Sequence, residues 1–212
     1  MSWDDYEFKA LSTDQAEAED GFSLDDSAQR ASLIGLYQES FFNSTYEEDF
    51  RFSQVQGKLD NLQQLDFEGA VAVKGDGIPI GFAWGFRLEE WMLDDQDFLE
   101  TYEFDLDPVE GDREEFEDYF DGETFYCAEL GVSSDYRGQG LGTQLKSEEL
   151  SLVEYHKSYD RALMRTNVDN PKKQKIDKPL GFEETEFEIE VEMARADGTQ
   201  EKDRRVYMER GV

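Results

Sequence analysis

The sequence predicts a mixed α/β fold of the α+β type, in which helices cover both faces of a mostly antiparallel sheet of about seven strands. A strand pattern at 125–132 leads through a glycine-rich turn into a helical pattern at 140–157 and then a strand at 162–166. A crossover helix of this kind joins two parallel strands. The other strand patterns are typical of antiparallel strands. Residues 67–87 have the pattern of a hairpin, and residues 186–193 alternate between acidic and apolar side chains.

Two helices are predicted near the N-terminus, after a short first strand at 6–11. The residues Ser23-Leu24-Asp25-Asp26 match a capping box, which would start the first of these helices. Apolar residues then recur at helical spacing, at Leu33, Ile34, Tyr37 and Phe41. The second helix is predicted over residues 52–65. This order places one strand and two helices before the hairpin.

The hairpin has strands at 67–73 and 78–87, joined by the turn residues Lys74-Gly75-Asp76-Gly77. Pro79 suits an early strand position or a sheet edge, because proline has no N–H to donate to a neighbouring strand. We find no internal repeat and no linker between independent domains. The length of 212 residues therefore predicts a single domain over residues 1–212.

Residues 89–121 form an insert between the hairpin and the next strand. The insert holds sixteen acidic residues, one basic residue (Arg113) and seven aromatic residues. One interpretation is a lid that recognises an amine through carboxylates and aromatic faces. The other is a helical surface elaboration whose aromatic side chains pack on the core while the acids face solvent. The sequence favours the second interpretation and leaves the first open.

The last third of the chain also has the patterns of helices and strands. The helix at 140–157 has an apolar stripe made of Leu141, Leu145, Leu152 and His156, so we interpret His156 as a packed or C-terminal helix residue rather than a catalyst. A short helix is predicted at 173–180. Residues 186–193 predict a half-buried strand with a solvated glutamate face, and Asp197-Gly198 marks the turn before a closing strand at 205–209.

The chain is strongly acidic. Its 52 Asp and Glu residues against 21 Lys and Arg residues give a formal net charge of −31. The acids are scattered along every predicted element, which is typical of adaptation to a salt-filled cytoplasm, and we expect a halophilic source. At molar salt the Debye length is only about 3 Å, so this self-repulsion is tolerable. The charge argues against nucleic acid or an anionic membrane surface as a partner, and it favours a cationic substrate.

Single copies of cysteine and histidine limit the chemistry. Cys127 has no partner for an internal disulfide and, within a predicted strand, should be a buried and inert thiol. One histidine excludes a histidine-rich metal site, and we predict no metal.

No apolar run approaches the roughly 20 residues of a membrane span. The acidic residues 1–5 have no signal-peptide pattern, so we expect a cytoplasmic protein.

The most informative stretch is residues 126–145, where Gly138, Gly140 and Gly142 separate a strand from a helix. Glycines have no Cβ, so the backbone can adopt positive φ and a ligand can approach closely. The first N–H groups of a helix lack intrahelical partners and carry the positive end of its dipole, which suits a pyrophosphate. A P-loop is excluded because Thr143-Gln144 follows Gly142. The spacing G-x-G-x-x-G of a dinucleotide-binding turn is absent as well.

The segment Arg137-Gly138-Gln139-Gly140-Leu141-Gly142, preceded by Glu129-Leu130-Gly131-Val132, resembles the acetyl-CoA site of the GNAT family of N-acetyltransferases. The family signature is Arg/Gln-x-x-Gly-x-Gly/Ala after a strand that ends in an apolar-x-Val. A second match is Asn170, which stands eleven residues before Gly181-Phe182 with a short helix between them. Together the two matches cover residues 122–182, and the rest of the chain fits only in the order of its elements.

This resemblance implies a sheet whose central parallel strands splay apart where acetyl-CoA, the acyl donor, enters. Backbone groups of Leu130 and Val132 would contact the pantetheine arm, N–H groups from Gly138 to Thr143 would hold the pyrophosphate, and Asn170 would lie near the thiol. The residues implied to bind acetyl-CoA are Leu130, Gly131, Val132, Arg137, Gly138, Gln139, Gly140, Leu141, Gly142, Thr143 and Asn170.

Transfer to an amine by direct attack needs a base, or a water chain, that removes a proton from the amine. The resemblance implies Glu129 as the catalytic base, because family members often carry a carboxylate on this strand. The alternative is an ordinary surface glutamate. Many members place a tyrosine four residues before the Gly-Phe pair as the acid for coenzyme A, but this chain has Asp177 there. An ionised aspartate cannot donate a proton, so another group, solvent or unaided departure of the thiolate would replace it.

Two functions follow from these residues. The first is an acetyl-CoA-dependent N-acetyltransferase that acts on a primary amine of a small molecule or a protein N-terminus. The alternative is a non-catalytic acyl-CoA-binding or sensing protein on the same fold. The glycine turn and Glu129 favour the enzyme, whereas Asp177 favours the binding protein. A homodimer is common in the family, and the closing strands of this chain are suited to pair across a two-fold axis.

Overall fold

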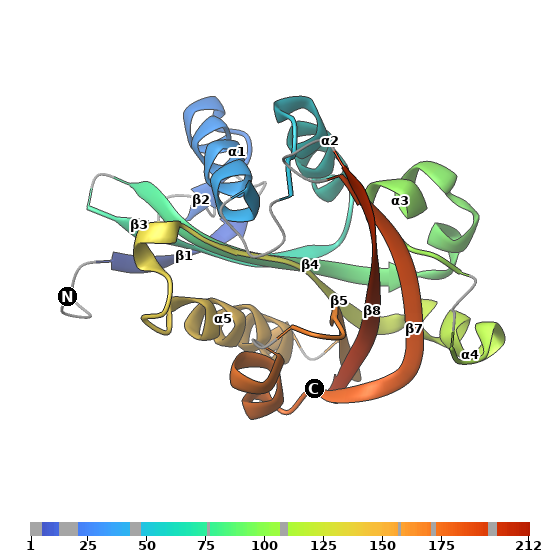
Figure 1. Cartoon of the computed structure of the whole chain (residues 1–212). Coiled ribbons are helices and arrows are strands. Elements are labelled where there is room, and N and C mark those ends of the chain that lie inside the picture. Colours follow the sequence, from blue (N-terminus) through green and yellow to red (C-terminus); the bar gives the residue numbers. More distant parts are fainter. Residues whose placement is uncertain are drawn as a thin grey trace. The chain divides into compact units, whose positions relative to one another are not determined.

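The computed structural model describes residues 6–12, 21–42, 48–75, 77–106, 110–156, 158–170, 173–194 and 199–212 (Figure 1). Several predictions fall at least partly outside these ranges. They include the turn at Asp197-Gly198, Asp76 of the hairpin turn, residues 107–109 of the insert, the last residue (157) of the helix predicted at 140–157, and the N-terminal residues 1–5.

Eight strands form the sheet, in the order β2-β1-β3-β4-β5-β6-β8-β7. Their bounds are β1 Tyr6–Ser12, β2 Phe22–Ser23, β3 Phe67–Lys74, β4 Ile78–Glu89, β5 Asp121–Val132, β6 Arg161–Asn167, β7 Glu183–Ala194 and β8 Gln200–Gly211. The longer helices are α1 Ser27–Phe42, α2 Phe52–Leu62 and α5 Leu141–His156, and the shorter ones are α3 Gln96–Thr101 and α4 Arg113–Glu117. Short helical turns also occupy Lys173–Asp177 and Lys178–Leu180, within the helix predicted at 173–180.

Strand pairing confirms the predicted fold class. β1 runs antiparallel to β3, and β8 runs antiparallel to both β6 and β7. β5 and β6 are parallel, and their ladder ends at Cys127↔Met164 although both strands continue, which is the predicted splay. The count of seven strands was one too low. The two-residue strand β2 pairs with Leu11 and Ser12 of β1, and a strand of that length leaves no periodic pattern.

The chain forms two compact units. The first consists of Met1–Gly85 and Glu129–Leu152, and the second consists of Phe86–Ala128 and Val153–Val212. β4, β5 and α5 each contribute residues to both units. The fragment of β5 that begins at Glu129 belongs to the first unit, together with the glycine turn that follows it.

In the first unit, α1 and α5 pack on opposite faces of β4. The ring of Tyr37 in α1 stacks on Phe82 and Trp84, with centroids 5.6 and 5.9 Å apart. Gly81 faces the other way, where a Cβ would lie 2.6 Å from Leu145 Cδ1 of α5. Neighbouring residues of a strand point to opposite faces. Consequently α1 covers the face of β4 that carries Phe82 and Trp84, and α5 covers the face that Gly81 leaves open for Leu145. Figure 1 shows the two helices on opposite sides of the strand.

The predicted capping box at Ser23 was wrong. The carboxylate of Asp26 caps α1 instead, because its Oδ1 accepts hydrogen bonds from the N–H groups of Ala28 and Gln29 at 2.8 and 2.9 Å. Ser23 belongs to β2, and its own N–H donates to Gln29 Oε1 at 2.8 Å. Pairing with β1 therefore overrides the local capping pattern and moves the start of the helix to Ser27.

Replacing Asp26 with alanine should lower the free energy of unfolding by about 1 kcal/mol, because the N–H groups of the first helical turn lose their acceptor. Urea unfolding at constant salt measures the change. Asp26→Ser keeps an oxygen at the same position and should retain most of the stability. Equal losses in the two variants would contradict a capping role for the side chain.

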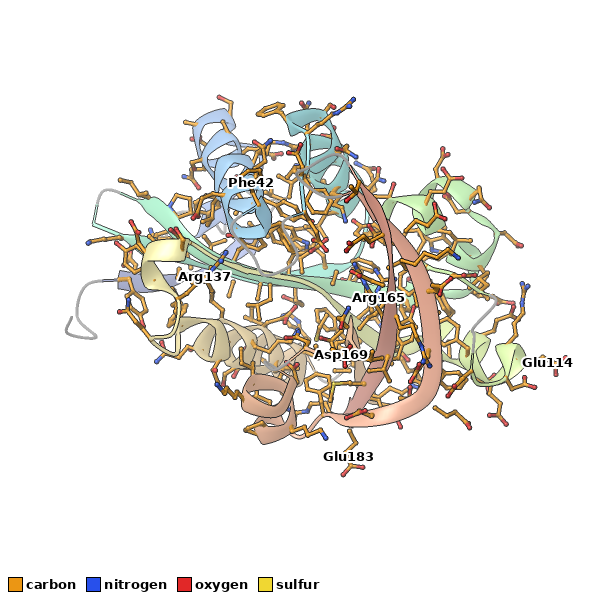
Figure 2. All side chains as sticks on the ribbon, viewed as in Figure 1. Phe42, Glu114, Arg137, Arg165, Asp169 and Glu183 are labelled. Carbon is orange, nitrogen blue, oxygen red and sulfur yellow. The ribbon has the colours of Figure 1, made fainter. Side chains whose placement is uncertain are left out.

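In the second unit, the insert at 89–121 contributes α3 and α4, and its aromatic side chains are mostly buried. Ring contacts join Phe104 to Tyr126 of β5 and Phe116 to Tyr207 of β8, each with centroids 4.8 Å apart. The buried aromatic residues are Phe98, Tyr102, Phe104, Phe116, Tyr119 and Phe120, whereas Trp91 is 47% exposed. Packing thus accounts for the aromatic content of the insert, while acids such as Glu114 point to solvent (Figure 2).

β7 confirms the predicted half-buried strand. Phe187, Ile189 and Val191 are buried, and the glutamates Glu190 and Glu192 between and after them are exposed. Cys127 is buried and forms no disulfide, as predicted. The stripe predicted for α5 was partly wrong, since His156 is exposed and the buried apolar residues of the helix are Leu141, Leu145, Leu150 and Val153. Within the described ranges, no helix is both long and apolar enough to cross a membrane.

Candidate functional site

The glycine turn lies between the end of β5 at Val132 and the start of α5 at Leu141. Gly138 and Gly140 have φ values of 74° and 88°, a left-handed region that side-chain-bearing residues avoid. Both glycines are exposed, and a Cβ at Gly138 would meet open space. The N–H of Gln144 donates to the carbonyl of Gly140 at 3.2 Å, as in a regular helix. The N–H groups of residues 141–143 belong to the first helical turn, before this hydrogen bond. The turn therefore offers exposed backbone donors at the positive end of a sixteen-residue helix.

Several hydrogen bonds hold the segment that connects β5 to this turn. The guanidinium of Arg137 donates from Nε to the carbonyl of Val132 at 2.9 Å, and a second guanidinium nitrogen donates to the carbonyl of Ser40 in α1. The N–H of Ser134 donates to Glu39 Oε1 at 2.9 Å. Arg137 thus anchors the turn to β5 and to α1. A phosphate contact by Arg137 stays a prediction, and the anchoring contacts are an additional structural reason for an arginine at this position.

The strand residues predicted to contact acetyl-CoA lie at the end of β5. Leu130 and Val132 are half-buried and pack against a core cluster that includes Leu141. Gly131 is buried over the ring of Phe82, and a Cβ there would lie 2.3 Å from its Cζ. The glycine is therefore required by packing, whatever its relation to a cofactor.

The remaining predicted residues of the turn differ in exposure. Gln139 is exposed, and its amide donates to the carbonyl of Asp135 at 3.1 Å. Leu141 is 2% exposed and so contributes to the core. Gly142 and Thr143 are half-buried. Among the residues of the first unit that are predicted to bind acetyl-CoA, the exposed ones are Gly138, Gln139 and Gly140. Their backbone is the most accessible to a ligand.

Asn170 and Asp177 belong to the second unit. The amide of Asn170 donates to Thr166 Oγ1 of β6 at 2.8 Å, and its N–H donates to the carbonyl of Asn167 at 3.0 Å. These bonds shape the turn that follows β6. Asp177 is 4% exposed, and its carbonyl accepts the N–H of Phe182 at 3.2 Å. Its buried position distinguishes it from the many solvated acids of this chain.

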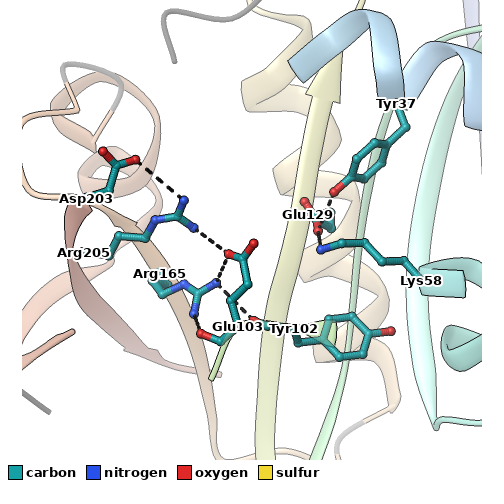
Figure 3. Close-up of polar contacts among 8 residues, drawn as sticks. All are labelled: Tyr37, Lys58, Tyr102, Glu103, Glu129, Arg165, Asp203 and Arg205. Carbon is teal, nitrogen blue, oxygen red and sulfur yellow. Dashed lines mark hydrogen bonds and ion pairs between the residues drawn. The ribbon is translucent and has the colours of Figure 1, made fainter. Parts of the chain in front are cut away.

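Glu129, the predicted base, is held by side chains from two helices of its own unit. Its Oε1 accepts hydrogen bonds from the hydroxyl of Tyr37 in α1 and from Nζ of Lys58 in α2, both at 2.9 Å (Figure 3). The side chains of Lys58 and Glu129 are 11% and 12% exposed, so this ion pair is largely shielded from water. Among the described residues, none donates a hydrogen bond to Oε2 of Glu129. One carboxylate oxygen is thus occupied and the other is available to a ligand or a water molecule.

Aromatic rings surround the same pair. Nζ of Lys58 lies 5.6 Å from the ring centroid of Phe50, within the range of a cation–π contact. Phe50 in turn packs edge-on against Tyr37, with centroids 5.2 Å apart. The ammonium of Lys58 therefore has a carboxylate, a phenol and an aromatic face as its neighbours.

A pocket of about 850 Å³ also lies in the first unit, bounded by α1, the hairpin between β3 and β4, and residues 133–136. None of the predicted site residues lines it. Two charged side chains at its wall have partners, because Glu39 accepts the N–H of Ser134 and Lys74 donates to the hydroxyl of Tyr136 at 3.2 Å. The pocket is therefore distinct from the predicted site.

The sequence matches the family model described as the acetyltransferase (GNAT) family over residues 31–182. The chain belongs to this family. The match contains Glu129, the glycine turn, Asn170 and Asp177, and it begins within α1. No curated protein matches the chain.

Solved structures share the fold at low sequence identity. An N-acetyltransferase from Staphylococcus aureus is 12% identical, with a TM-score of 0.61 and coverage of 97% of this chain and 98% of that one. A ribosomal-protein-alanine N-acetyltransferase from Brucella melitensis is 15% identical, with a TM-score of 0.58 and coverage of 87% and 95%. A phosphinothricin acetyltransferase from Sinorhizobium meliloti, solved with acetyl-CoA, is 16% identical, with a TM-score of 0.57 and coverage of 86% and 82%. These likenesses show the GNAT fold.

Sequence reasoning missed Lys58 and Tyr37 as neighbours of Glu129. Lys58 is 71 positions away in the chain, so only the tertiary fold brings the two together. A signal was nevertheless present. Val55 and Leu59 are buried residues of α2, and Lys58 lies three positions after the first and one before the second. A single lysine on the apolar stripe of a helix indicates a buried ammonium that needs an anion.

A second charged cluster, in the second unit, was also missed. Arg165 of β6 is 7% exposed and donates to Glu103 Oε2 at 3.2 Å and to the carbonyl of Tyr102 at 3.1 Å (Figure 3). Arg205 of β8 donates to the same carboxylate oxygen at 3.2 Å. Burial alone would lower the pKa of Arg165, but Coulombic interactions with Tyr126, Tyr207 and Glu103 outweigh it and raise the pKa above its ordinary value. Arg165 is therefore a permanent charge.

Proposed function

We propose that this chain is an acetyl-CoA-dependent N-acetyltransferase that transfers an acetyl group to a primary amine, with an acetyltransferase domain that spans residues 1–212. The observation that carries the proposal is the turn at Gly138 and Gly140, where two left-handed glycines expose backbone N–H groups at the start of α5 directly after β5. Family membership supports the same reaction class. Acetyl-CoA as the donor is also supported by the acetyl-CoA in the Sinorhizobium meliloti enzyme.

The residues of the turn fit a pyrophosphate. The exposed glycines allow an anion to approach the backbone, and the helix N-terminus supplies oriented donors without a charged side chain. In this proposal, N–H groups from Gly138 to Thr143 hold the pyrophosphate, and backbone groups of Leu130 and Val132 contact the pantetheine arm. Arg137 lies beside the phosphates while its guanidinium also anchors the turn, and Asn170 lies near the thiol end.

In the proposed chemistry, Glu129 removes a proton from the acceptor amine through Oε2, the oxygen that accepts no hydrogen bond from the described residues. The nitrogen lone pair then attacks the carbonyl carbon of the thioester, and a C–N bond forms. The C–S bond breaks as coenzyme A leaves as a thiolate, and the surplus proton on the new amide nitrogen passes to the thiolate or to solvent. A carboxylate shielded by aromatic rings suits proton transfer, because water competes less for it.

The proposed donor is a single compound, acetyl-CoA, whereas the proposed acceptor is a class of amines. We propose a primary amine on a small molecule or a protein N-terminus, and the net charge of −31 favours a cationic one. The same acidic charge supports a halophilic source and a cytoplasmic location. A homodimer through the closing strands is compatible with the proposal. Nucleic acid and membrane surfaces are not proposed as partners.

One observation favours a second candidate, a non-catalytic acyl-CoA-binding protein. Asp177 is 4% exposed and stands where many relatives are expected to have a tyrosine that protonates coenzyme A. An acid that is ionised cannot donate that proton, so the departing thiolate would need solvent or another group. Amine-dependent release of free thiol would exclude the binding-only function.

Calorimetric titration of acetyl-CoA into the folded protein in molar KCl tests the proposal first, with desulfo-CoA and ATP alongside. We expect saturable binding in the micromolar range for acetyl-CoA, and none for ATP. A panel of primary amines then follows, with free thiol measured as the product. Absence of acetyl-CoA binding in a sample with a cooperative unfolding transition would overturn both the enzyme and the binding protein.

Gly138→Val should weaken acetyl-CoA binding about tenfold or more, because a β-branched residue at positive φ distorts the turn and its side chain projects into the open space at Gly138. The matched control is Gly77→Val in the β3–β4 hairpin. Gly77 has φ 79° and equally open space around a Cβ, so its backbone strain is comparable. Calorimetry should give wild-type affinity for Gly77→Val. Equal affinities for the two variants would separate the turn from the cofactor.

A further inference from the structure

The ammonium of Lys58 is turned into the protein, as is that of Lys146, whose side chain is 2% exposed. It lies on the apolar stripe of α2, between the buried residues Val55 and Leu59, and its side chain is 11% exposed. Its Nζ donates to Glu129 Oε1 at 2.9 Å. A lysine ammonium is strongly hydrated, and its removal from water is compensated only by close anionic and polar partners.

The donors to Glu129 are held firmly. Tyr37 is buried, and its ring stacks on Phe82 with an interplanar angle of 9°, so its hydroxyl has little freedom to move. Lys58 reaches the same oxygen from a different helix and is restrained by the ring of Phe50 at 5.6 Å. Two donors from α1 and α2 therefore converge on Oε1, which fixes the rotation of the carboxylate.

The contact between α1 and α2 does not depend on the buried ion pair of Lys58 and Glu129. Arg30 of α1 already bonds to Asp60 of α2 at the surface, where Asp60 is 57% exposed, and also to Gln63. Replacing a buried ion pair by apolar residues is often neutral or stabilising, so stability alone is weak grounds for a lysine here. The particular effect of Lys58 is to orient the carboxylate of Glu129 and to place a positive charge next to it.

We propose that Lys58 is a positioning residue for the base: with Tyr37 it fixes Oε1 of Glu129, places a positive charge beside the carboxylate, and leaves Oε2 as the oxygen that takes the proton of the acceptor amine. This inference rests on the proposed acetyl transfer. The titratable groups that donate hydrogen bonds to Glu129 among the described residues are Lys58 from α2 and Tyr37 from α1, and of the two Lys58 is the charged one.

The test is the pH profile of kcat/KM for amine-dependent thiol release in Lys58→Met and Lys58→Arg. A positively charged neighbour favours the ionised form of a carboxylate, and Lys58→Met removes that neighbour. The acid limb of the Lys58→Met profile should therefore move to higher pH by about one pH unit or more. Lys58→Arg keeps the charge and should restore the wild-type limb. The KM for acetyl-CoA should not change in either variant.

Lys58→Gln is the second variant in case Lys58→Met does not fold, because its amide can still donate a hydrogen bond while the charge is absent. Its acid limb should move in the same direction as that of Lys58→Met. The matched control is Asp60→Asn, which lies two residues further along α2 and breaks an exposed ion pair. Its acid limb and its activity should remain those of the wild type. Thermal unfolding of every variant verifies that only folded proteins are compared.

The outcomes separate this inference from the proposed function. An unchanged acid limb in a folded, active Lys58→Met or Lys58→Gln protein would overturn the role of Lys58 while the acetyltransferase proposal stands. A limb that moves equally in Lys58→Arg would also overturn it, because the charge would then be irrelevant. If the wild-type protein binds acetyl-CoA but releases no thiol with any amine, the proposed catalysis fails, and the role of Lys58 fails with it.

Discussion

Glu129→Gln is expected to lower kcat/KM for amine acetylation by about tenfold or more in the pH range where proton removal limits the rate. Glutamine has nearly the same shape, and its carbonyl can still accept the hydrogen bonds of Tyr37 and Lys58, so the position of the side chain should persist. What disappears is the capacity to take a proton. The measurement is the initial rate of thiol release across pH, with acetyl-CoA saturating and the amine varied.

A suitable control for this variant is Glu123→Gln. Glu123 lies on the same strand, is exposed, and is not part of the proposed site. Its activity and its pH profile should match those of the wild type. A normal kcat/KM in Glu129→Gln at all pH values would remove Glu129 from the proton transfer and leave its pair with Lys58 as a structural contact. Loss of acetyl-CoA affinity in Glu129→Gln would instead indicate a role in donor binding.

Local sequence signals were sufficient for the glycine turn. An apolar strand, three glycines at alternate positions and an apolar-striped helix specify a strand–turn–helix unit within twenty residues, and the structure has β5, left-handed Gly138 and Gly140, and α5 there. The hairpin at β3 and β4 and the alternating strand β7 were predictable for the same reason. In each of these segments, the residues that determine the local conformation are close together in the chain.

The partners of Glu129 were not predictable in this way. Tyr37 and Lys58 are separated from it by 92 and 71 positions, and helical spacing alone assigns Tyr37 to an apolar face without indicating what its hydroxyl contacts. The start of α1 was mispredicted for a related reason. Ser23 and Asp26 are both acceptable caps locally, and pairing with β1 decides between them by placing Ser23 in a strand. Long-range pairing thus determines what the local pattern leaves open.

The cluster around Arg165 illustrates the same limit for the insert. Glu103 adopts a positive φ of 55° at the end of α3, which a glutamate tolerates only where its surroundings hold it. Those surroundings are Arg165 and Arg205, whose guanidinium groups both donate to its Oε2 at 3.2 Å. The sequence showed an acidic insert, but it contained no indication that one of these acids faces two arginines of the sheet.

Arg165→Met should therefore lower the free energy of unfolding by about 3–5 kcal/mol, the range for removal of one partner from a buried ion pair. Methionine fills most of the volume. The carbonyls of Tyr102 and Glu103 and one carboxylate oxygen would nevertheless lose a buried donor. Arg205 can compensate only in part, because it bonds to the carboxylate and already lies 3.9 Å from Asp203. Chemical denaturation in constant molar KCl, followed by circular dichroism, measures the change.

The matched comparison is Arg204→Met on β8. Arg204 is also paired with glutamates, Glu188 and Glu110, but its side chain is 50% exposed, so the loss should be at most about 1 kcal/mol and smaller still in molar salt. The two variants remove the same charge and differ mainly in burial. If they were equally destabilised, the burial of Arg165 would not be the source of its effect. A large difference would instead mean that the insert is tied to the sheet through a desolvated charge, whose interactions persist at salt concentrations that screen the acidic surface.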